Sequence, residues 1–234
     1  MKKLIVLFSV IFLTFIIYKV NANNLIDYMS IGDSLDLGIN SYGNNTYSYH
    51  DYLKNYLDNN NLLHKTSFYY SKNNYKIEEL LNDIKNNKEI IYNDKTYNIK
   101  KELREADLIT IFIGMDELIN KIESNITSSD IDTLINNMDS LVSTIKKISS
   151  SNIVLIGYYN PYLDNLKISK IFFYINDRYK ELASKYKINY IDILNLNSNK
   201  EYLHNYKDYH LNSKGYLKIA SKIIEKLDYC YSLD

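Results

Sequence analysis

The chain has 234 residues and no net charge, because 28 lysine and arginine residues balance 28 aspartate and glutamate residues. This balance provides no general attraction to nucleic acid or to an anionic lipid surface. The single cysteine, Cys230, cannot form an internal disulfide, and no cluster of cysteine and histidine has the spacing of zinc ligands. The length suits one well-packed domain and is short for two.

The first 22 residues have the features of a secretory signal peptide. Lys2 and Lys3 form a positively charged start, and the largely apolar stretch 4–17 that follows is short for a membrane span. Small residues before and at Ala22 predict cleavage there, and an uncleaved N-terminal anchor is the alternative. We therefore expect residues 23–234 to form one domain outside the cytoplasmic membrane, either secreted or on the outer face of that membrane.

After this segment, short apolar runs alternate with helical patterns. Strands are predicted at residues 25–31, 66–70, 107–113, 152–156 and 188–193. Helices are predicted at residues 49–57, 77–84, 131–148, 168–186 and 213–227. The stretch 89–101 fits an irregular insertion or a small hairpin. The alternation predicts a three-layer α/β/α sandwich with a mainly parallel five-stranded sheet.

The first predicted strand ends in Gly32-Asp33-Ser34-Leu35, which makes Ser34 a candidate nucleophile. Glycine permits a sharp turn, and unpaired N–H groups lie where a helix or turn begins. Ligand sites in open parallel sheets lie at the carboxyl ends of the strands. A serine there can attack a carbonyl while N–H groups hold the oxyanion. A strand that ends in an ordinary polar turn is the alternative reading of these four residues.

Of the four histidines, His210 is the candidate general base. It precedes the last predicted helix on a loop at the same sheet edge, and Asp208, two residues earlier, is placed to orient the imidazole. His204, in the same loop, is the competing candidate. We interpret His50, on a predicted helix, and His64, in a polar turn, as surface residues.

The serine motif and the segment His-Leu-Asn-Ser-Lys-Gly-Tyr that begins at His210 together resemble the GDSL, or SGNH, hydrolase family. The stretch around Gly114 and Asp116 takes the place of the family's third block, Gly-x-Asn-Asp. The loop 157–162 looks like that of bacterial secreted members. The resemblance spans essentially the whole chain after the signal segment. It implies a flavodoxin-like sheet, an esterase or lipase-like activity, and no metal or organic cofactor.

The resemblance also implies roles for individual residues. Ser34 would be the nucleophile and His210 the general base. The oxyanion donors would be the Ser34 N–H, a second-block glycine N–H and a third-block asparagine side chain. By position the second-block site falls at Asn74, and asparagine tolerates left-handed backbone better than most residues. The third-block residues correspond to Gly114 and Asp116.

Two departures from the family pattern concern charge. An asparagine side chain donates hydrogen bonds, whereas the ionised carboxylate of Asp116 would only accept them and would repel an oxyanion. Asp116 would donate only in its protonated form, and the loss of one oxyanion donor costs ~10²–10³ in turnover. The family's acid lies three residues before the histidine, where this chain has Lys207. Asp208 would then serve through a shorter loop, or the site would be a Ser–His dyad.

These observations predict an extracytoplasmic serine esterase or lipase-like hydrolase that cleaves a small-molecule, lipid or acylated-sugar ester through an acyl-serine. The alternative is a weakened or inactive protein of the same fold that binds carbohydrate or envelope ligands. No nucleic-acid partner is expected, and contact with a membrane is expected only through an uncleaved N-terminal segment. No glycine-rich nucleotide-binding motif follows any predicted strand.

Overall fold

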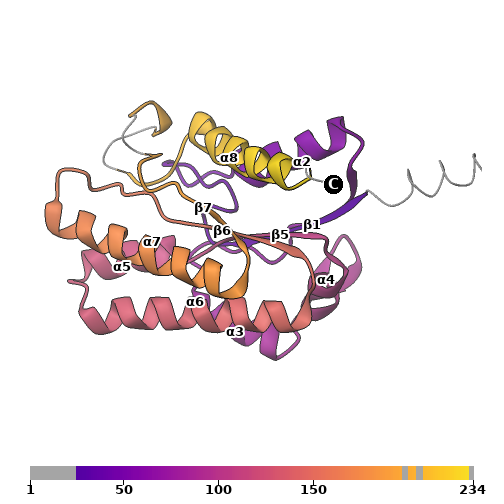
Figure 1. The fold of residues 1–234 in the computed structure, drawn as a ribbon, viewed down its shortest axis with the longest axis horizontal. Coiled ribbons are helices and arrows are strands. Elements are labelled where there is room, and N and C mark those ends of the chain that lie inside the picture. Colours follow the sequence, from indigo (N-terminus) through magenta and orange to yellow (C-terminus); the bar gives the residue numbers. More distant parts are fainter. Residues whose placement is uncertain (1–24, 197–199, 204–207, 232–234) are drawn as a thin grey trace, which may run out of the picture.

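The computed structural model describes residues 25–196, 200–203 and 208–231. A five-stranded sheet runs through the molecule in the order β2-β1-β5-β6-β7, and every neighbouring pair is parallel (Figure 1). Its strands are β1 (Ile26–Gly32), β2 (Leu63–Ser67), β5 (Leu108–Phe112), β6 (Asn152–Ile156) and β7 (Asn189–Ile191). The predicted parallel five-stranded sheet is confirmed.

Helices cover both faces of this sheet, which gives the predicted three layers (Figure 1). One face carries α2 (Tyr49–Asn59) and α8 (Ser213–Tyr231). The other face carries α3 (Ile77–Lys85), α4 (Ile99–Glu105), α5 (Met115–Glu123), α6 (Ser128–Ile148) and α7 (Leu166–Tyr186). No helix in the described part of the chain is long and apolar enough to cross a membrane.

The core forms where the apolar patterns of the sequence meet. Every residue of β5 is buried because this strand lies at the centre of the sheet. In α3 the buried residues are Ile77, Leu80, Leu81 and Ile84, the apolar stripe that helical spacing predicts. Thr110 is the single polar residue of β5, and its hydroxyl lies 2.9 Å from that of Tyr28.

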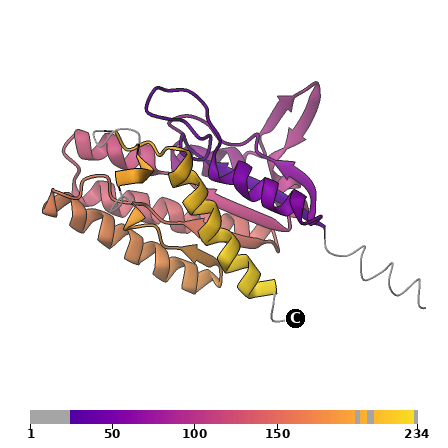
Figure 2. The ribbon, with the colours of Figure 1, turned by 90° about the horizontal axis from the view of Figure 1, so that it is seen from above.

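Three local features differ from the predicted elements or resolve an alternative. The stretch 89–101 forms the hairpin of β3 (Glu89–Tyr92) and β4 (Lys95–Asn98), which projects from the body in Figure 2, and then enters α4. The second sheet strand begins at Leu63, earlier than predicted, because the run 63–67 pairs with β1 although it is polar. Helix α5 was not predicted. It begins after Gly114, whose φ of 95° breaks the strand direction.

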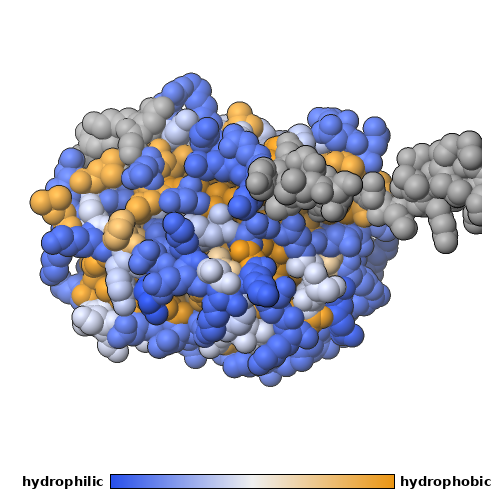
Figure 3. Space-filling view, viewed as in Figure 1, coloured by the Kyte–Doolittle hydropathy of each residue, from blue (hydrophilic) through white to orange (hydrophobic). Residues whose placement is uncertain are grey.

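The face of the molecule in Figure 3 is mainly hydrophilic, with hydrophobic patches at the end where α7 begins. Leu163, Leu166 and Phe173 are exposed in this region.

Several sequence-based predictions fall outside the described residues. The signal segment, its cleavage after Ala22 and the start of the domain at residue 23 belong to residues 1–24. His204 and Lys207 lie within 204–207.

Candidate active site

Ser34 lies at the carboxyl end of β1, on the turn that Gly32 permits. A Cβ atom at Gly32 would stand 2.3 Å from both the Phe112 carbonyl oxygen and the Asp36 Cβ, so only glycine fits this close approach. The Asp33 N–H donates to the same Phe112 carbonyl at 3.2 Å and ties the turn to β5. Ser34 itself is only 1% exposed.

Asp33 joins the serine turn to the start of α5. Its Oδ2 accepts hydrogen bonds from the backbone N–H groups of Gly114, Met115 and Asp116 at 2.8, 2.9 and 3.3 Å. Its Oδ1 accepts the N–H of Leu35 at 3.2 Å. Asp33 thereby satisfies N–H groups that the first turn of a helix leaves unpaired. The Gly114 N–H is directed at Asp33 and not at the space beside Ser34.

Asp116 occupies the space beside Ser34. Its Oδ1 accepts the Ser34 hydroxyl at 2.5 Å, and its Oδ2 accepts two backbone N–H groups, from Ser34 at 3.2 Å and Asn74 at 3.1 Å. Asn74 has a φ of 55°, in the left-handed region that asparagine adopts more readily than most residues. This conformation lets Asn74 direct its N–H at Asp116 where the family has a glycine. Two N–H groups that converge on one oxygen beside a serine form the geometry of an oxyanion hole. Here the oxygen is the protein's own.

The buried position of Asp33 changes the ionisation of its carboxyl group. Burial, and then the negative charge of Asp116, raise the pKa of the Asp33 carboxyl well above its usual range. The backbone hydrogen bonds to Asp33 oppose this shift.

His210 and Asp208 form the predicted contact. The His210 Nδ1 lies 2.7 Å from Asp208 Oδ1, and the His210 N–H donates to the same oxygen at 2.9 Å. This local turn brings the carboxylate to the ring from two residues away. The contact leaves Nε2 as the ring nitrogen that can face a substrate or Ser34.

Tyr209 connects the histidine loop to Asp116. Its hydroxyl donates to Asp116 Oδ1 at 3.0 Å, and its ring stacks on His210 with centroids 4.3 Å apart. The Tyr159 hydroxyl donates to the Tyr209 carbonyl and anchors the loop from β6. No hydrogen bond joins Ser34 to His210 among the described residues, because the Ser34 hydroxyl is turned to Asp116.

The chain matches the family model described as GDSL-like Lipase/Acylhydrolase over residues 28–223. The chain belongs to this family. It is an ester-cleaving serine hydrolase of the GDSL type. No curated protein matches the chain.

Solved structures share the fold of this GDSL-like acylhydrolase at low sequence identity. A lipase, Lip_vut3, from a goat rumen metagenome is 21% identical with a TM-score of 0.70, over 86% of this chain and 96% of that one. The acetylxylan esterase Axe2 from Geobacillus stearothermophilus is 13% identical with a TM-score of 0.67, over 86% and 93%. The esterase EstA from Pseudoalteromonas sp. is 13% identical with a TM-score of 0.62, over 88% and 98%.

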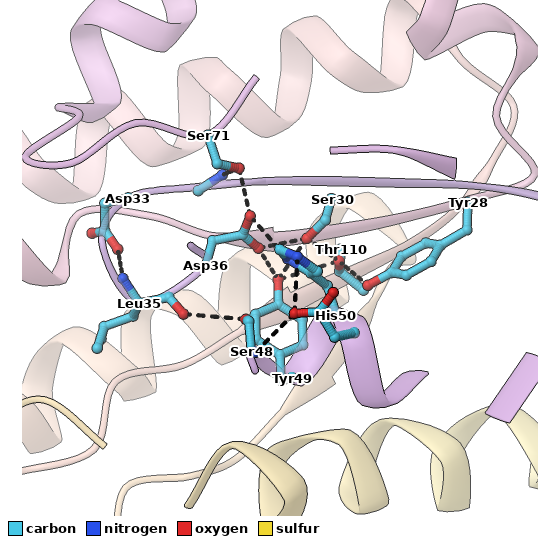
Figure 4. A network of polar contacts seen from close by, with 12 residues as sticks. Tyr28, Ser30, Asp33, Leu35, Asp36, Ser48, Tyr49, His50, Ser71 and Thr110 are labelled. Atoms are coloured by element: carbon cyan, nitrogen blue, oxygen red, sulfur yellow. Dashed lines mark hydrogen bonds and ion pairs between the residues drawn. The ribbon is translucent and has the colours of Figure 1, made fainter. Parts of the chain in front are cut away.

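A second polar cluster lies beneath the serine turn of this acylhydrolase, centred on Asp36 (Figure 4). Asp36 Oδ1 accepts the hydroxyls of Ser30 and Tyr49, each at 2.5 Å. Asp36 Oδ2 accepts the Ser71 hydroxyl at 2.5 Å and lies 3.4 Å from His50 Nδ1. We refer to these five residues as the Asp36 cluster.

The Asp36 cluster corrects the interpretation of His50 as a surface residue. His50 is buried because α2 turns it toward Asp36, and its ring packs on Phe68 with centroids 4.2 Å apart. His64 is exposed as expected, although it lies in β2, and it contacts Asp27 at 2.6 Å. The sequence signal that could have found the cluster is an aspartate two residues after the nucleophile, followed by a histidine on the apolar side of a helix.

The cluster also reaches the second-block loop. Ser71 accepts the Gly32 N–H at 3.0 Å while it donates to Asp36. Lys72 donates its N–H to the Gly32 carbonyl at 3.2 Å. These contacts hold the loop that carries Asn74 against the serine turn. No cluster of three or more potential metal ligands occurs among the residues that the structure describes.

Proposed function

We propose that this GDSL-type hydrolase cleaves carboxylic esters through an acyl-serine intermediate on Ser34, with His210 as general base and Asp208 as the residue that orients it. The observation that carries the proposal is the convergence of the Ser34 and Asn74 N–H groups beside the Ser34 hydroxyl. Such a pair of donors is what a tetrahedral intermediate of acyl transfer needs.

In this mechanism the Ser34 hydroxyl turns from Asp116 to His210 and attacks the ester carbonyl carbon. His210 takes the hydroxyl proton as the new C–O bond forms, and the carbonyl electrons move onto the oxygen held by the two N–H groups. Collapse of the intermediate breaks the bond to the alcohol, which leaves with the proton from His210. Water, activated by the same ring, then releases the acid and restores Ser34.

A fluorophosphonate probe tests the nucleophile. The native protein should gain the mass of one phosphonyl group, and Ser34→Ala should gain none. The matched control is Ser129→Ala, which removes an exposed hydroxyl on α6 and should label like the native protein. His210→Ala should slow labelling sharply, because removal of the base leaves an unactivated hydroxyl.

The alternative is a weakened or inactive protein that binds carbohydrate or envelope ligands. It draws support from one observation, namely that the Ser34 hydroxyl and both N–H donors are already engaged by Asp116. A folded native protein that takes no label at any pH between about 5 and 9, where a histidine base changes its charge, would favour the binder over the enzyme.

The substrate and the place of action also belong to this proposal. Small acyl esters, lipid esters and acylated sugars all suit the acyl-serine route. A series of p-nitrophenyl esters of increasing chain length measures the preferred acyl length. The N-terminal pattern supports action outside the cytoplasmic membrane, and a secreted product that starts at residue 23 would support cleavage after Ala22.

A further inference from the structure

The two N–H groups that converge beside the nucleophile belong to segments far apart in the sequence. Ser34 lies on the turn after β1, and Asn74 lies on the loop that follows β2. The pairing between these two strands ends at Met29 and Ser67, so the sheet itself does not align the turn with the loop. Contacts beyond the ends of the strands must therefore set the distance between the two donors.

Gly32 supplies these contacts through both of its backbone groups. Its N–H donates to the Ser71 hydroxyl oxygen at 3.0 Å, and its carbonyl accepts the Lys72 N–H at 3.2 Å. Gly32 stands two residues before Ser34. Ser71 and Lys72 stand three and two residues before Asn74. The two hydrogen bonds therefore join the turn to the loop close to both donors.

The carboxylate of Asp36 determines which way the Ser71 hydroxyl points (Figure 4). Ser71 donates its one hydroxyl proton to Asp36 Oδ2 at 2.5 Å, which leaves the lone pairs of its oxygen for the Gly32 N–H. A hydrogen bond to an ionised acceptor is stronger than one between neutral groups. Asp36 is fully buried, so its oxygens are shielded from bulk water. Asp36 thus holds Ser71 in the orientation that accepts from Gly32.

These contacts matter most when an ester replaces Asp116. In the free protein the Asp116 Oδ2 accepts both N–H groups and so links the loop to the turn. An ester oxygen reaches the same N–H groups only after this carboxyl group has moved away. Asn73 and Asn74 are exposed, so little packing holds this part of the loop. The two hydrogen bonds to Gly32 remain, and they keep the N–H of the loop beside the serine turn.

We propose that Ser71 is a positioning residue for ester cleavage: its hydrogen bonds hold the Asn74 N–H at the place where the oxyanion forms. This inference rests on the proposed acyl-serine mechanism. Ser71 acts through the loop and takes no part in proton transfer. The Asn74 N–H interacts more strongly with a developing oxyanion than with the carbonyl of the bound ester. Loss of the Ser71 hydroxyl should therefore lower kcat and leave KM close to its native value.

Ser30 provides a matched control within the Asp36 cluster. Its hydroxyl also donates to Asp36 at 2.5 Å, and its other contacts are the hydroxyls of Tyr49 and Thr110, each at 3.0 Å. None of these contacts reaches the loop after β2. Ser30→Ala and Ser71→Ala each remove one hydroxyl from the same carboxylate, so both should lower the urea midpoint. Only Ser71→Ala also releases the loop.

The test compares kcat and KM of the native protein and these two variants on a short-chain p-nitrophenyl ester, with fluorophosphonate labelling of Ser34 as the check on the nucleophile. Removal of one oxyanion donor costs about 10²–10³ in kcat. A displaced donor costs less, so Ser71→Ala should lower kcat by about 10–10²-fold. Ser30→Ala should keep a kcat close to that of the native protein.

Two other variants separate hydrogen bonding from packing. Ser71→Cys keeps a side chain of similar size whose sulfur is a weak hydrogen-bond partner, so its kcat should fall as in Ser71→Ala. Ser71→Thr keeps the hydroxyl and should retain most of the native kcat. Ethylboronic acid forms a tetrahedral adduct with a reactive serine, and its oxygen needs the same N–H groups. Its affinity should therefore weaken by the same factor as kcat in each variant.

Equal kcat in native protein and Ser71→Cys, with Ser34 labelled in both, would overturn the positioning role and leave the acyl-serine mechanism standing. A fall in kcat that Ser30→Ala shares would also overturn it, because the loss would then follow from a weakened Asp36 cluster. An unchanged boronate affinity in Ser71→Ala would do the same. An absence of Ser34 labelling in native protein and in every variant would overturn the mechanism and the positioning role together.

Discussion

Two buried aspartates lie three residues apart on the serine turn and are stabilised in opposite ways. Asp36 meets hydroxyl donors and the imidazole of His50. Asp33 meets only backbone N–H groups and lies beside the carboxyl group of Asp116. Figure 4 shows Asp33 turned away from the Asp36 cluster.

The difference shows that the charge of the neighbours, and not burial alone, decides the ionisation of a buried carboxyl group. Burial opposes the charge on both. At Asp36 the nearby imidazole and the hydroxyls outweigh it and lower the pKa. At Asp33 burial and the second carboxyl group act together and raise the pKa. The Asp36 cluster therefore holds the serine turn in place with a charge that its neighbours stabilise, whereas the surroundings of Asp33 oppose its charge.

The largest stability effect should come from breaking the Asp36 cluster. Asp36→Ala leaves His50 buried without its partner, and loss of one member of a buried charged pair costs ~3–5 kcal/mol in the free energy of unfolding. Urea unfolding measures this. Asp132→Ala, an exposed aspartate on α6, is the control and should stay within ~0.5 kcal/mol of native.

Urea unfolding of a variant at Asp116 tests the other buried carboxyl site, beside Asp33. Asp116→Asn relieves the repulsion of Asp33 and should leave the free energy of unfolding unchanged or raise it. Equal losses for Asp36→Ala and Asp116→Asn would contradict the division into a structural site and a reactive one.

The pH dependence of stability should also separate the two sites. Asp36 has a lowered pKa, so its contribution is present above its ordinary value of 3.8 and is lost as pH falls through the folded value. His50 has a raised pKa, which the Asp36 charge causes against the effect of burial. Its contribution is full below 6.5 and is lost as pH rises through the folded value.

The Asp36 cluster should therefore stabilise the protein most between the lowered pKa of Asp36 and the raised pKa of His50. Asp33 has the opposite effect to Asp36. Its pKa is raised in the folded protein, so Asp33 makes the fold less stable as pH rises from 3.8 through that raised pKa. In native protein the urea midpoint should fall as pH rises through the titration of His50. In His50→Gln this fall should be absent. An unchanged midpoint curve in that variant would show that His50 does not carry a charge in the fold.

Tyr209 is the position where we expect the smallest loss of reactivity at Ser34. Tyr209→Phe removes the hydroxyl that donates to Asp116 Oδ1 and keeps the ring that stacks on His210. A hydrogen bond to a charged group contributes ~1.5–3 kcal/mol, so the labelling rate of Ser34 should change by no more than about 10²-fold. A loss of labelling comparable to that in His210→Ala would assign Tyr209 to the reaction itself.

Much of the site could be predicted because its signals are local. Ser34 follows a strand, and His210 precedes a helix, so both fall at one sheet edge once the strands are parallel. Asp208 and His210 are two residues apart, and one turn brings them together. Position in the chain alone predicts Asn74, and its left-handed φ of 55° explains how its N–H reaches Asp116 without a glycine.

The sequence by itself determined the three layers, the parallel sheet and the sheet edge at which Ser34 and His210 both lie, because apolar periodicity is a property of each segment. Only the tertiary structure decided that Asp116 takes the N–H groups of Ser34 and Asn74, that Asp33 takes the N–H of Gly114, and that His50 lies buried on Asp36. These contacts join residues from 14 to more than 80 positions apart in the sequence. The hydrogen-bond partners and charges that meet there depend on packing, which no single segment encodes.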